Sequence, residues 1–366
     1  MTPAGPVLDQ RTLNRTLLAR QGLLARERRP AREVVERLVG LQAQEPIDPY
    51  VALWTRIEGF DPLDLSGLIE RREAVRMGTL RGTLHLVTAA DCVALVPVLA
   101  ANRERAWRSS PFAKRLAGLD IDAVVAAGRE ALEREPLSPA ALGEALSARW
   151  PGRDKPSLAY ATRIMLPLVQ VPPRGLWRQT GRTVNTTAEA WLGVAMGTDA
   201  DPEPFIRRYL AAFGPATPAD VRTWSWLTGV REILERMRPT LSTYRDEAGR
   251  ELFDLPDAPI ADPDLPAPVR FLPQYDNVFL SHDDRSRISG VLSWGLEFVW
   301  KGVILVDGGI TGAWRVLRKG KAATMTIELG RPLTPAEHRD LDEEAERLGA
   351  FLDPDGPRET RVVPPP

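Results

Sequence analysis

The sequence has few of the residues that bind metal ions or form disulfides. Its single cysteine, Cys92, lies in an apolar run, which excludes an intrachain disulfide framework and a thiolate metal cluster. The three histidines, at positions 85, 282 and 338, are too few and too widely spaced for a zinc or iron site. We therefore expect a cytoplasmic protein that works without a metal or another cofactor.

Long apolar runs and an excess of either charge are also missing. No apolar run approaches about 18 residues, and the amino terminus lacks the order of a signal peptide, so we expect no membrane span and no export. The formal net charge of -1 means that a nucleic acid partner would need a local basic patch. The basic residues are nearly all arginine, which suits phosphates and guanine edges better than lysine does, although a GC-rich genome produces the same bias.

Apolar residues make up 43% of the 366-residue chain, enough for two or three compact units. Near the amino terminus their spacing predicts helices over residues 8–24, from Pro30 onward, from Pro49 to Gly59, and over residues 63–70. An alternating stretch over residues 75–87 follows, with Arg81 and Gly82 at its turn. Helices followed by such a hairpin are typical of a winged helix.

The same order recurs twice along the chain. In the second copy, Ser138 and Pro139 open a helix, residues 158–169 form another, and residues 174–180 form a strand and wing. In the third copy, a capping box of Thr217 and Asp220 opens a helix. A second helix over residues 230–237 and a hairpin over residues 249–255 complete that copy.

The period of the pattern changes beyond a Pro- and Asp-rich linker at residues 256–270. Short strands are predicted over residues 269–272, 290–299, 303–306, 313–317 and 323–328, with Asp307-Gly308-Gly309 as a hairpin turn. A charged helix over residues 335–348 and a frayed, Pro-rich tail follow. We expect an α+β fold of three tandem winged helices, at residues 1–118, 119–200 and 201–258, with a C-terminal β-rich subdomain and helix at 259–366.

Gln42 and Gln44 lie in a short polar break between two of the predicted helices. Side chains alternate along an extended segment, so the two amides point the same way, with the small Ala43 between them. Because an amide offers both a donor and an acceptor, such a pair can orient a water molecule or pair with a base edge. Glutamine is also a common surface residue, and such a break is an ordinary place for it.

The surrounding residues resemble a known family. Residues 41–45 (LQAQE), 52–54 (ALW) and 80–87 (LRGTLHLV) are similar to the amino-terminal signature of the bacterial AlkZ-like winged-helix DNA glycosylases, with the YcaQ-like enzymes as relatives. Residues 271–277 (FLPQYDN) and 281–285 (SHDDR) resemble the same family. The AlkZ-like branch carries Gln-x-Gln where the YcaQ-like branch carries Gln-x-Asp, and Gln42 and Gln44 match the former.

Cleavage of an N-glycosidic bond passes through an oxocarbenium-like state and needs a water at C1′. An N7- or N3-alkylated purine is already cationic and departs without being protonated, so two neutral amides suffice to place that water. The resemblance implies this role for Gln42 and Gln44. Glu45 is a candidate for stabilising the developing charge, whereas Asp48 is better explained by the dipole of the Pro49 helix. No lysine lies near the motif, so we expect a monofunctional enzyme rather than a Schiff-base lyase.

Other residues are candidates for supporting the site or for binding DNA. His85, with Thr83 on the same face of its strand, is either a core residue or part of the active-site wall. Arg81, at a wing tip beside a glycine, is a candidate phosphate ligand. On the second predicted wing, Trp177 is a candidate for stacking on DNA, with Arg174 and Arg178 as basic neighbours.

The sequence thus predicts a monomeric, monofunctional DNA glycosylase that acts on double-stranded DNA containing alkylated purines. The Gln-x-Gln signature of the resembling branch implies self-protection against a DNA-alkylating natural product, including the unhooking of crosslinks. A DNA-binding regulator without catalysis is the first alternative, because winged helices support it equally well. A protein that sequesters a drug without touching DNA is the second.

Overall fold

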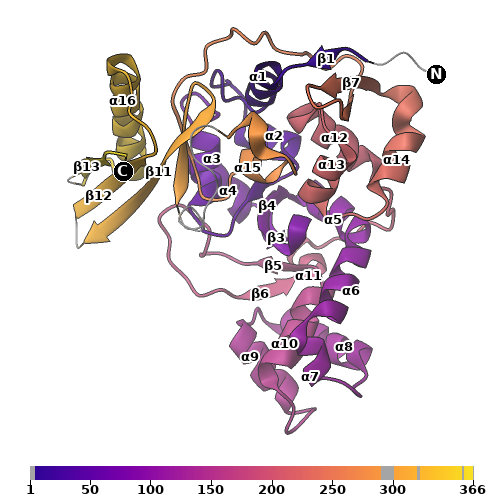
Figure 1. Ribbon diagram of the computed structural model, residues 1–366. Coiled ribbons are helices and arrows are strands. Elements are labelled where there is room, and N and C mark those ends of the chain that lie inside the picture. Colours follow the sequence, from indigo (N-terminus) through magenta and orange to yellow (C-terminus); the bar gives the residue numbers. More distant parts are fainter. Residues whose placement is uncertain (1–4, 290–300, 320–321, 357, 366) are drawn as a thin grey trace.

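We describe a computed structural model of the protein, over residues 5–289, 301–319, 322–356 and 358–365. The fold is α+β, with three sheets and helices throughout (Figure 1). Many helices begin where an Asp, Ser or Thr side chain caps the first turn, often with a proline next to it. Ser138 accepts from the amide of Ala141, and the predicted capping box of Thr217 and Asp220 is confirmed. Within these ranges, no helix combines the length and apolar character needed to cross a membrane.

One order of elements occurs three times along the chain. The first set comprises α2 (Ala31–Arg37), β2 (Leu41–Gln42), α3 (Asp48–Trp54), α4 (Pro62–Glu70), β3 (Ala74–Gly78) and β4 (Leu84–Thr88). The second comprises α8 (Ile121–Arg134), α9 (Pro139–Ser147), α10 (Lys155–Met165), β5 (Leu168–Gln170) and β6 (Asn185–Thr187). The third comprises α12 (Glu203–Phe213), α13 (Pro218–Ser225), α14 (Val230–Met237), β7 (Ser242–Asp246) and β8 (Glu251–Asp254). In each set, a segment between the first two helices pairs with the last strand: β2 with β4, Leu137 with Asn185, and Ala216 with Phe253.

The first two sets share one sheet, with the strand order β2-β4-β3-β5-β6. The predicted helix over residues 158–169 ends early, at Met165, because Pro167 keeps Leu166 extended and the chain continues as β5. The predicted strand and wing over residues 174–180 is wrong. That segment is irregular, since the adjacent Pro172 and Pro173 cannot donate to a strand ladder.

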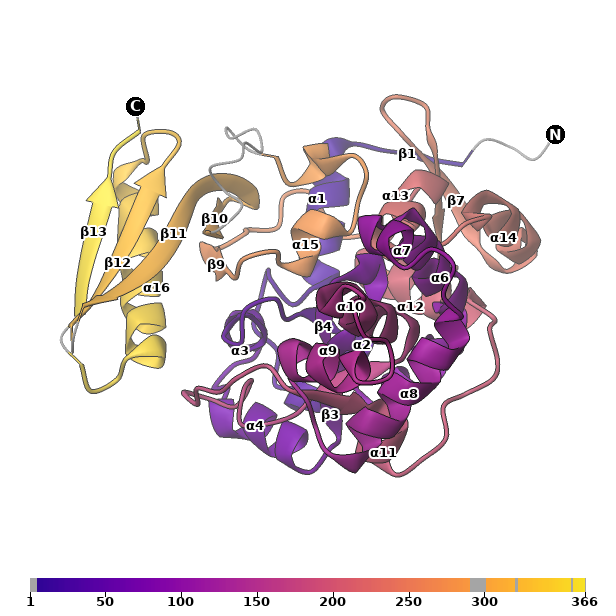
Figure 2. The same ribbon diagram turned by 90° about the horizontal axis from the view of Figure 1, so that it is seen from below.

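The helices of the second set have a core of their own. The buried cluster runs from Trp107 to Leu166 and is separate from the main core. Trp107 of α6 (Ala100–Ser109) belongs to this cluster, and Phe112 and Ala113 of α7 (Pro111–Arg115) pack against it. The sequence analysis predicted no helix at α6 or α7, nor at α5 (Ala89–Val98) or α8. Helices α7 to α10 lie together at one end of the molecule, away from the carboxyl terminus (Figures 1 and 2).

The C-terminal part forms a five-stranded sheet in the order β13-β12-β11-β10-β9. Its elements are β9 (Arg270–Leu272), α15 (Asn277–Leu280), β10 (Gly302–Val306), β11 (Gly309–Lys319), β12 (Ala322–Leu329), α16 (Pro335–Leu352) and β13 (Arg358–Val363). Four of the predicted strands and the turn at Asp307 and Gly308 are confirmed, whereas the strand predicted at residues 290–299 lies outside the described residues. The frayed tail is a wrong prediction, because β13 pairs in parallel with β12.

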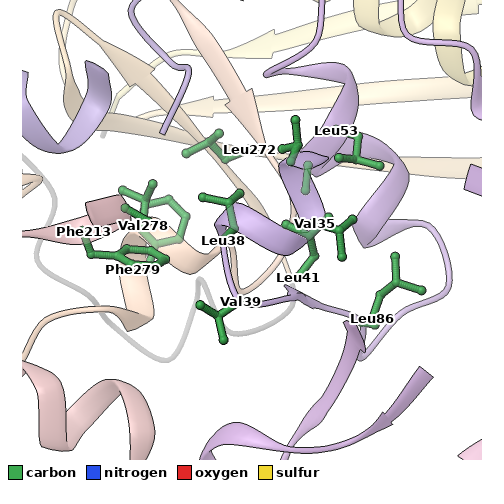
Figure 3. Packing of buried hydrophobic residues seen from close by; sticks show 14 of the residues in the cluster. Val35, Leu38, Val39, Leu41, Leu53, Leu86, Phe213, Leu272, Val278 and Phe279 are labelled. Carbon is green, nitrogen blue, oxygen red and sulfur yellow. The ribbon is translucent and has the colours of Figure 1, made fainter. Parts of the chain in front are cut away.

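The main core joins residues that are far apart in the sequence. Leu38, just after α2, lies near Val278 and Phe279 of α15, and Phe213, from the end of α12, lies beside Phe279 (Figure 3). The start of the chain belongs to this packing too. The strand β1 (Val7–Leu8) pairs with β7, and Arg20, at the end of α1 (Gln10–Arg20), forms a buried ion pair with Asp254.

A second buried ion pair fixes the segment that carries the two glutamines. Arg56, just after α3, donates to both carboxylate oxygens of Asp276 at 2.9 and 2.7 Å, and the two side chains are 0% and 1% exposed. The next residue, Asn277, donates to the carbonyl of Gly40 at 2.7 Å. Gly40 must be glycine, because its φ is +93° and a Cβ would lie 2.9 Å from the Leu86 carbonyl oxygen. Two consecutive residues of the C-terminal part therefore hold both ends of the segment from Gly40 to Arg56.

We predict that Asp276→Asn lowers the free energy of unfolding by about 3–5 kcal/mol, because it leaves the buried Arg56 charge without its partner. Urea denaturation measures the change. Glu58→Gln is the matched control, since Glu58 pairs with Arg28 on the surface and such pairs contribute little. Equal stability of the two variants would contradict the role given to the buried pair.

Candidate active site

A cavity of about 640 Å³, here called the central cavity, lies where the shared sheet meets α10. Its polar lining includes Gln44, Glu45, Arg76, Thr83, Arg163 and Arg174, and Gly82 also lines it. Arg163 and Arg174 donate to no protein acceptor within the part of the chain that the structure describes. The cavity is therefore locally basic in a chain whose net charge is -1, as binding of a phosphate backbone requires.

The two glutamines are held differently. Gln42, in β2, is 6% exposed, and its Oε1 accepts from Nη2 of Arg81 at 3.0 Å and lies 3.3 Å from the Thr83 hydroxyl. Gln44, in the bend after β2, is exposed and lines the central cavity. The oxygen of Gln42 is thus occupied, so only its amide NH₂ is left to donate. The amide of Gln44 has no hydrogen-bond partner among the described residues, so it can donate or accept.

Arg81 ties the turn between β3 and β4 to its surroundings. It has a left-handed backbone (φ 56°) in the short helix η1 (Leu80–Gly82), as does Gly82 beside it. Its guanidinium donates to Gln42, to the Trp224 carbonyl at 2.7 Å and to Nε2 of His85 at 3.0 Å. Burial lowers the pKa of Arg81 to about 10, so it stays charged at neutral pH. The sequence analysis assigned Arg81 to a DNA phosphate, whereas here its donors serve three protein acceptors.

His85 is a neutral part of the same network. It lies in β4, is 1% exposed, and places Nδ1 3.1 Å from the Thr83 carbonyl. Burial, and then the charge on Arg81, lowers the pKa of His85 to about 3. Because Arg81 can only donate, Nε2 of His85 accepts and Nδ1 carries the proton. His85 therefore supports the Arg81 side chain and is not set up to deliver a proton at neutral pH.

The two carboxylates near the motif have different settings. Glu45 is exposed and is the one carboxylate among the described residues that line the central cavity. Asp48, the first residue of α3, is 4% exposed and accepts from the amide of Glu45 at 3.2 Å. Burial raises the pKa of Asp48 well above its usual range. Asp48 lines a second cavity of about 560 Å³, whose lining also includes Glu45.

Arg76 is a site residue that the sequence analysis did not find. It lies in β3 and is 1% exposed, yet it lines the central cavity and donates to the Ala43 carbonyl at 2.8 Å. Its Nε and Nη1 atoms have no hydrogen-bond partner within the described residues. Burial, and then Arg174, lowers the pKa of Arg76 to about 10. The available signal was an arginine at a buried position of the apolar strand before Arg81.

The predicted second wing is divided between the two cavities. Arg174 reaches the central cavity, whereas Trp177 packs between Tyr50 and Phe351, with ring centroids 5.0 and 4.9 Å away. Arg178 donates to the Leu352 carbonyl at 3.0 Å. In this structure Trp177 and Arg178 therefore connect α3 to the end of α16. Among the predicted site residues, Gln42, Arg81, Thr83 and His85 form one hydrogen-bonded group. Thr83 also lines the central cavity together with Gln44, Glu45 and Arg174, whereas Gln42, Arg81 and His85 lie behind that lining.

The chain belongs to the AlkZ-like DNA glycosylase family, whose model matches residues 35–351. The fold is similar to that of a particular solved structure, the Streptomyces sahachiroi DNA glycosylase AlkZ. That match has a TM-score of 0.71 and 21% sequence identity, and covers 98% of this chain and 100% of the other. No curated protein sequence matches the chain.

We predict that His85 makes the protein less stable as the pH falls. Below pH about 6.5 the unfolded chain takes up a proton on this histidine, whereas the folded chain does so only near pH 3. Between pH 7.5 and 5 this difference costs about 2 kcal/mol of unfolding free energy. Urea denaturation at both pH values should show a smaller loss for His85→Gln than for the wild type. His338→Gln, which removes an exposed histidine, is the control, and equal losses in all three proteins would contradict the prediction.

Proposed function

We propose that the protein is a monofunctional DNA glycosylase that removes cationic N7- or N3-alkylated purines from double-stranded DNA. The observation that carries the proposal is the pair of glutamines. Gln44 is exposed on a basic cavity, and Gln42, two residues away, has its amide oriented by Arg81 and Thr83. Family membership supports a glycosylase, and the geometry supports a water nucleophile.

The two amides would act on the attacking water with opposite polarity. Since the Gln42 oxygen already accepts from Arg81, its NH₂ would donate to the water oxygen, and the oxygen of Gln44 would accept a water proton. As the C1′–N bond breaks, its electron pair passes to the base and neutralises the base's positive charge. The water oxygen then bonds to C1′ and loses a proton, for which Glu45 is the carboxylate at hand. Orientation of this kind can supply several kcal/mol of the barrier.

The remaining architecture supports binding to duplex DNA. We interpret the three repeated sets of elements as winged helices, each with two helices before a hairpin. Arg163 and Arg174, which line the central cavity, would contact phosphates there. A volume of about 640 Å³ is in the range of pockets that hold drug-sized ligands, which favours bulky adducts and crosslinked purines among the substrates. Removal of such lesions would provide repair or self-resistance to a genotoxic natural product.

A non-catalytic DNA-binding regulator is the second candidate. It is favoured by α13 and α14, which are joined by a turn with Gly229 in the left-handed conformation, as in a helix-turn-helix. A regulator would bind duplex DNA and release no base, so one assay separates the two functions.

We predict that Gln42→Ala and Gln44→Ala each slow base release by at least about tenfold, equivalent to about 1.4 kcal/mol of transition-state stabilisation. Single-turnover assays on N7-alkylguanine duplexes would measure free base and abasic sites. Gln179→Ala is the control, because Gln179 is exposed and outside the lining of the central cavity. Binding without base release by the wild type, across several alkylated duplexes, would favour the regulator.

We also predict that Arg174→Gln weakens binding to undamaged duplex DNA. Loss of one phosphate contact should reduce the slope of log K against log salt by about 0.9. Arg178→Gln is the matched control, since Arg178 donates to a protein carbonyl instead of lining the central cavity. Titrations between 50 and 200 mM salt, a range over which one phosphate contact changes affinity by about threefold, would test this. Identical slopes for wild type and Arg174→Gln would remove Arg174 from the DNA interface.

A further inference from the structure

Trp226 is exposed in a conformation that an aromatic residue rarely adopts. It follows the end of α13 with φ 60° and ψ 14°, in the left-handed region, and is 51% exposed. Trp224, two residues earlier, is 2% exposed. A large apolar ring left in water on a strained backbone position is the kind of feature that is retained for binding.

Three side chains from the first part of the chain hold the end of α13 in place. Arg81 donates to the carbonyl of Trp224 at 2.7 Å, Asn102 to that of Ser225 at 3.4 Å, and Arg105 to that of Trp226 at 2.9 Å. Asn102 and Arg105 lie on α6. Cationic donors at the carboxyl end of a helix are favourable, because the last carbonyls lack helical partners. The ring of Trp226 is therefore presented from a fixed backbone.

The ring lies at the rim of the central cavity. A Cβ placed on Gly82 would be 3.6 Å from Cζ3 of Trp226, and Gly82 itself lines the cavity together with Thr83. The residue before Gly82 is Arg81, which also holds the oxygen of Gln42. One guanidinium thus connects the amide of Gln42 to the helix end that carries Trp226.

We propose that Trp226 stacks on the face of a nucleobase next to the alkylated nucleotide, at the mouth of the central cavity. The assignment rests on the proposed function. Its occupant is DNA because the exposed Arg105 binds the backbone carbonyl of Trp226 and further arginines line the central cavity, a combination of ring and positive charge that matches a flat base flanked by phosphates. Stacking on an aromatic ring tolerates any base, as binding to damage in any sequence requires.

The test compares two substitutions of Trp226. Trp226→Asn removes the ring and introduces a residue that tolerates the left-handed backbone. Trp226→Phe keeps an aromatic face. Leu265→Asn, at a 40% exposed leucine in the linker, is the control for loss of exposed apolar surface. Affinity is measured for a duplex with an uncleavable abasic-site analogue, and single-turnover release for an N7-methylguanine duplex, with thermal melting of each protein as a check on folding.

We expect Trp226→Asn to bind about tenfold more weakly, Trp226→Phe to stay within about twofold of wild type, and Leu265→Asn to be unchanged. Wild-type affinity in Trp226→Asn would overturn the inference, and it would leave the proposed function intact if the wild type releases base. A wild type that releases no base, with weaker binding only in Trp226→Asn, would overturn the proposed function and keep Trp226 as a DNA contact. Equal weakening in the Phe and Asn variants would also overturn the stacking role.

Discussion

The ion pair between Arg56 and Asp276 is the interaction on which the candidate site depends. Two charges this deeply buried are tolerated only when they are paired and hydrogen-bonded, and here both carboxylate oxygens are used. With Asn277 bound to Gly40, the pair fixes both ends of the segment that carries the glutamines. The family-like motifs at residues 41–45 and 271–277 are therefore two halves of one construction, although more than 200 residues separate them.

The charges around the cavity place a condition on the cationic substrate of the proposed function. Arg76 and Arg81 keep their charge at neutral pH despite burial, whereas His85 is neutral. These positive charges repel a cationic base. Under the proposed function, the site therefore attracts DNA through its phosphates. In the proposed reaction, departure of an alkylated base moves the positive charge onto the sugar and creates no new net charge. The repulsion from these arginines therefore changes little between the bound substrate and the transition state. Neutral amides at Gln42 and Gln44 fit this balance, because they orient water without adding a charge.

Much of the fold could be predicted from local signals. Capping residues and prolines marked the helix starts at Ser138 and Thr217, and alternation marked most strands. Errors came where local and long-range effects compete. Pro167 ended the predicted helix at Met165, and the predicted frayed tail forms strand β13 through its pairing with β12. At the site, the resemblance of residues 41–45 to the family signature pointed to Gln42 and Gln44 as candidates, but the partners of Arg81 and the burial of Arg76 arise from contacts across three parts of the chain.

The shared sheet of the first two element sets has a mechanical consequence. Strands β2, β4 and β3 on one side and β5 and β6 on the other form one continuous hydrogen-bonded surface beneath the central cavity. Opening or closing that cavity as a hinge would have to break ladder bonds between β3 and β5. Because the sheet resists opening, the conformational change needed for binding must occur in the DNA. A DNA duplex whose damaged base enters this cavity must itself bend or open. Because the energy of bending depends on sequence, lesions in easily bent sequences would then be processed faster.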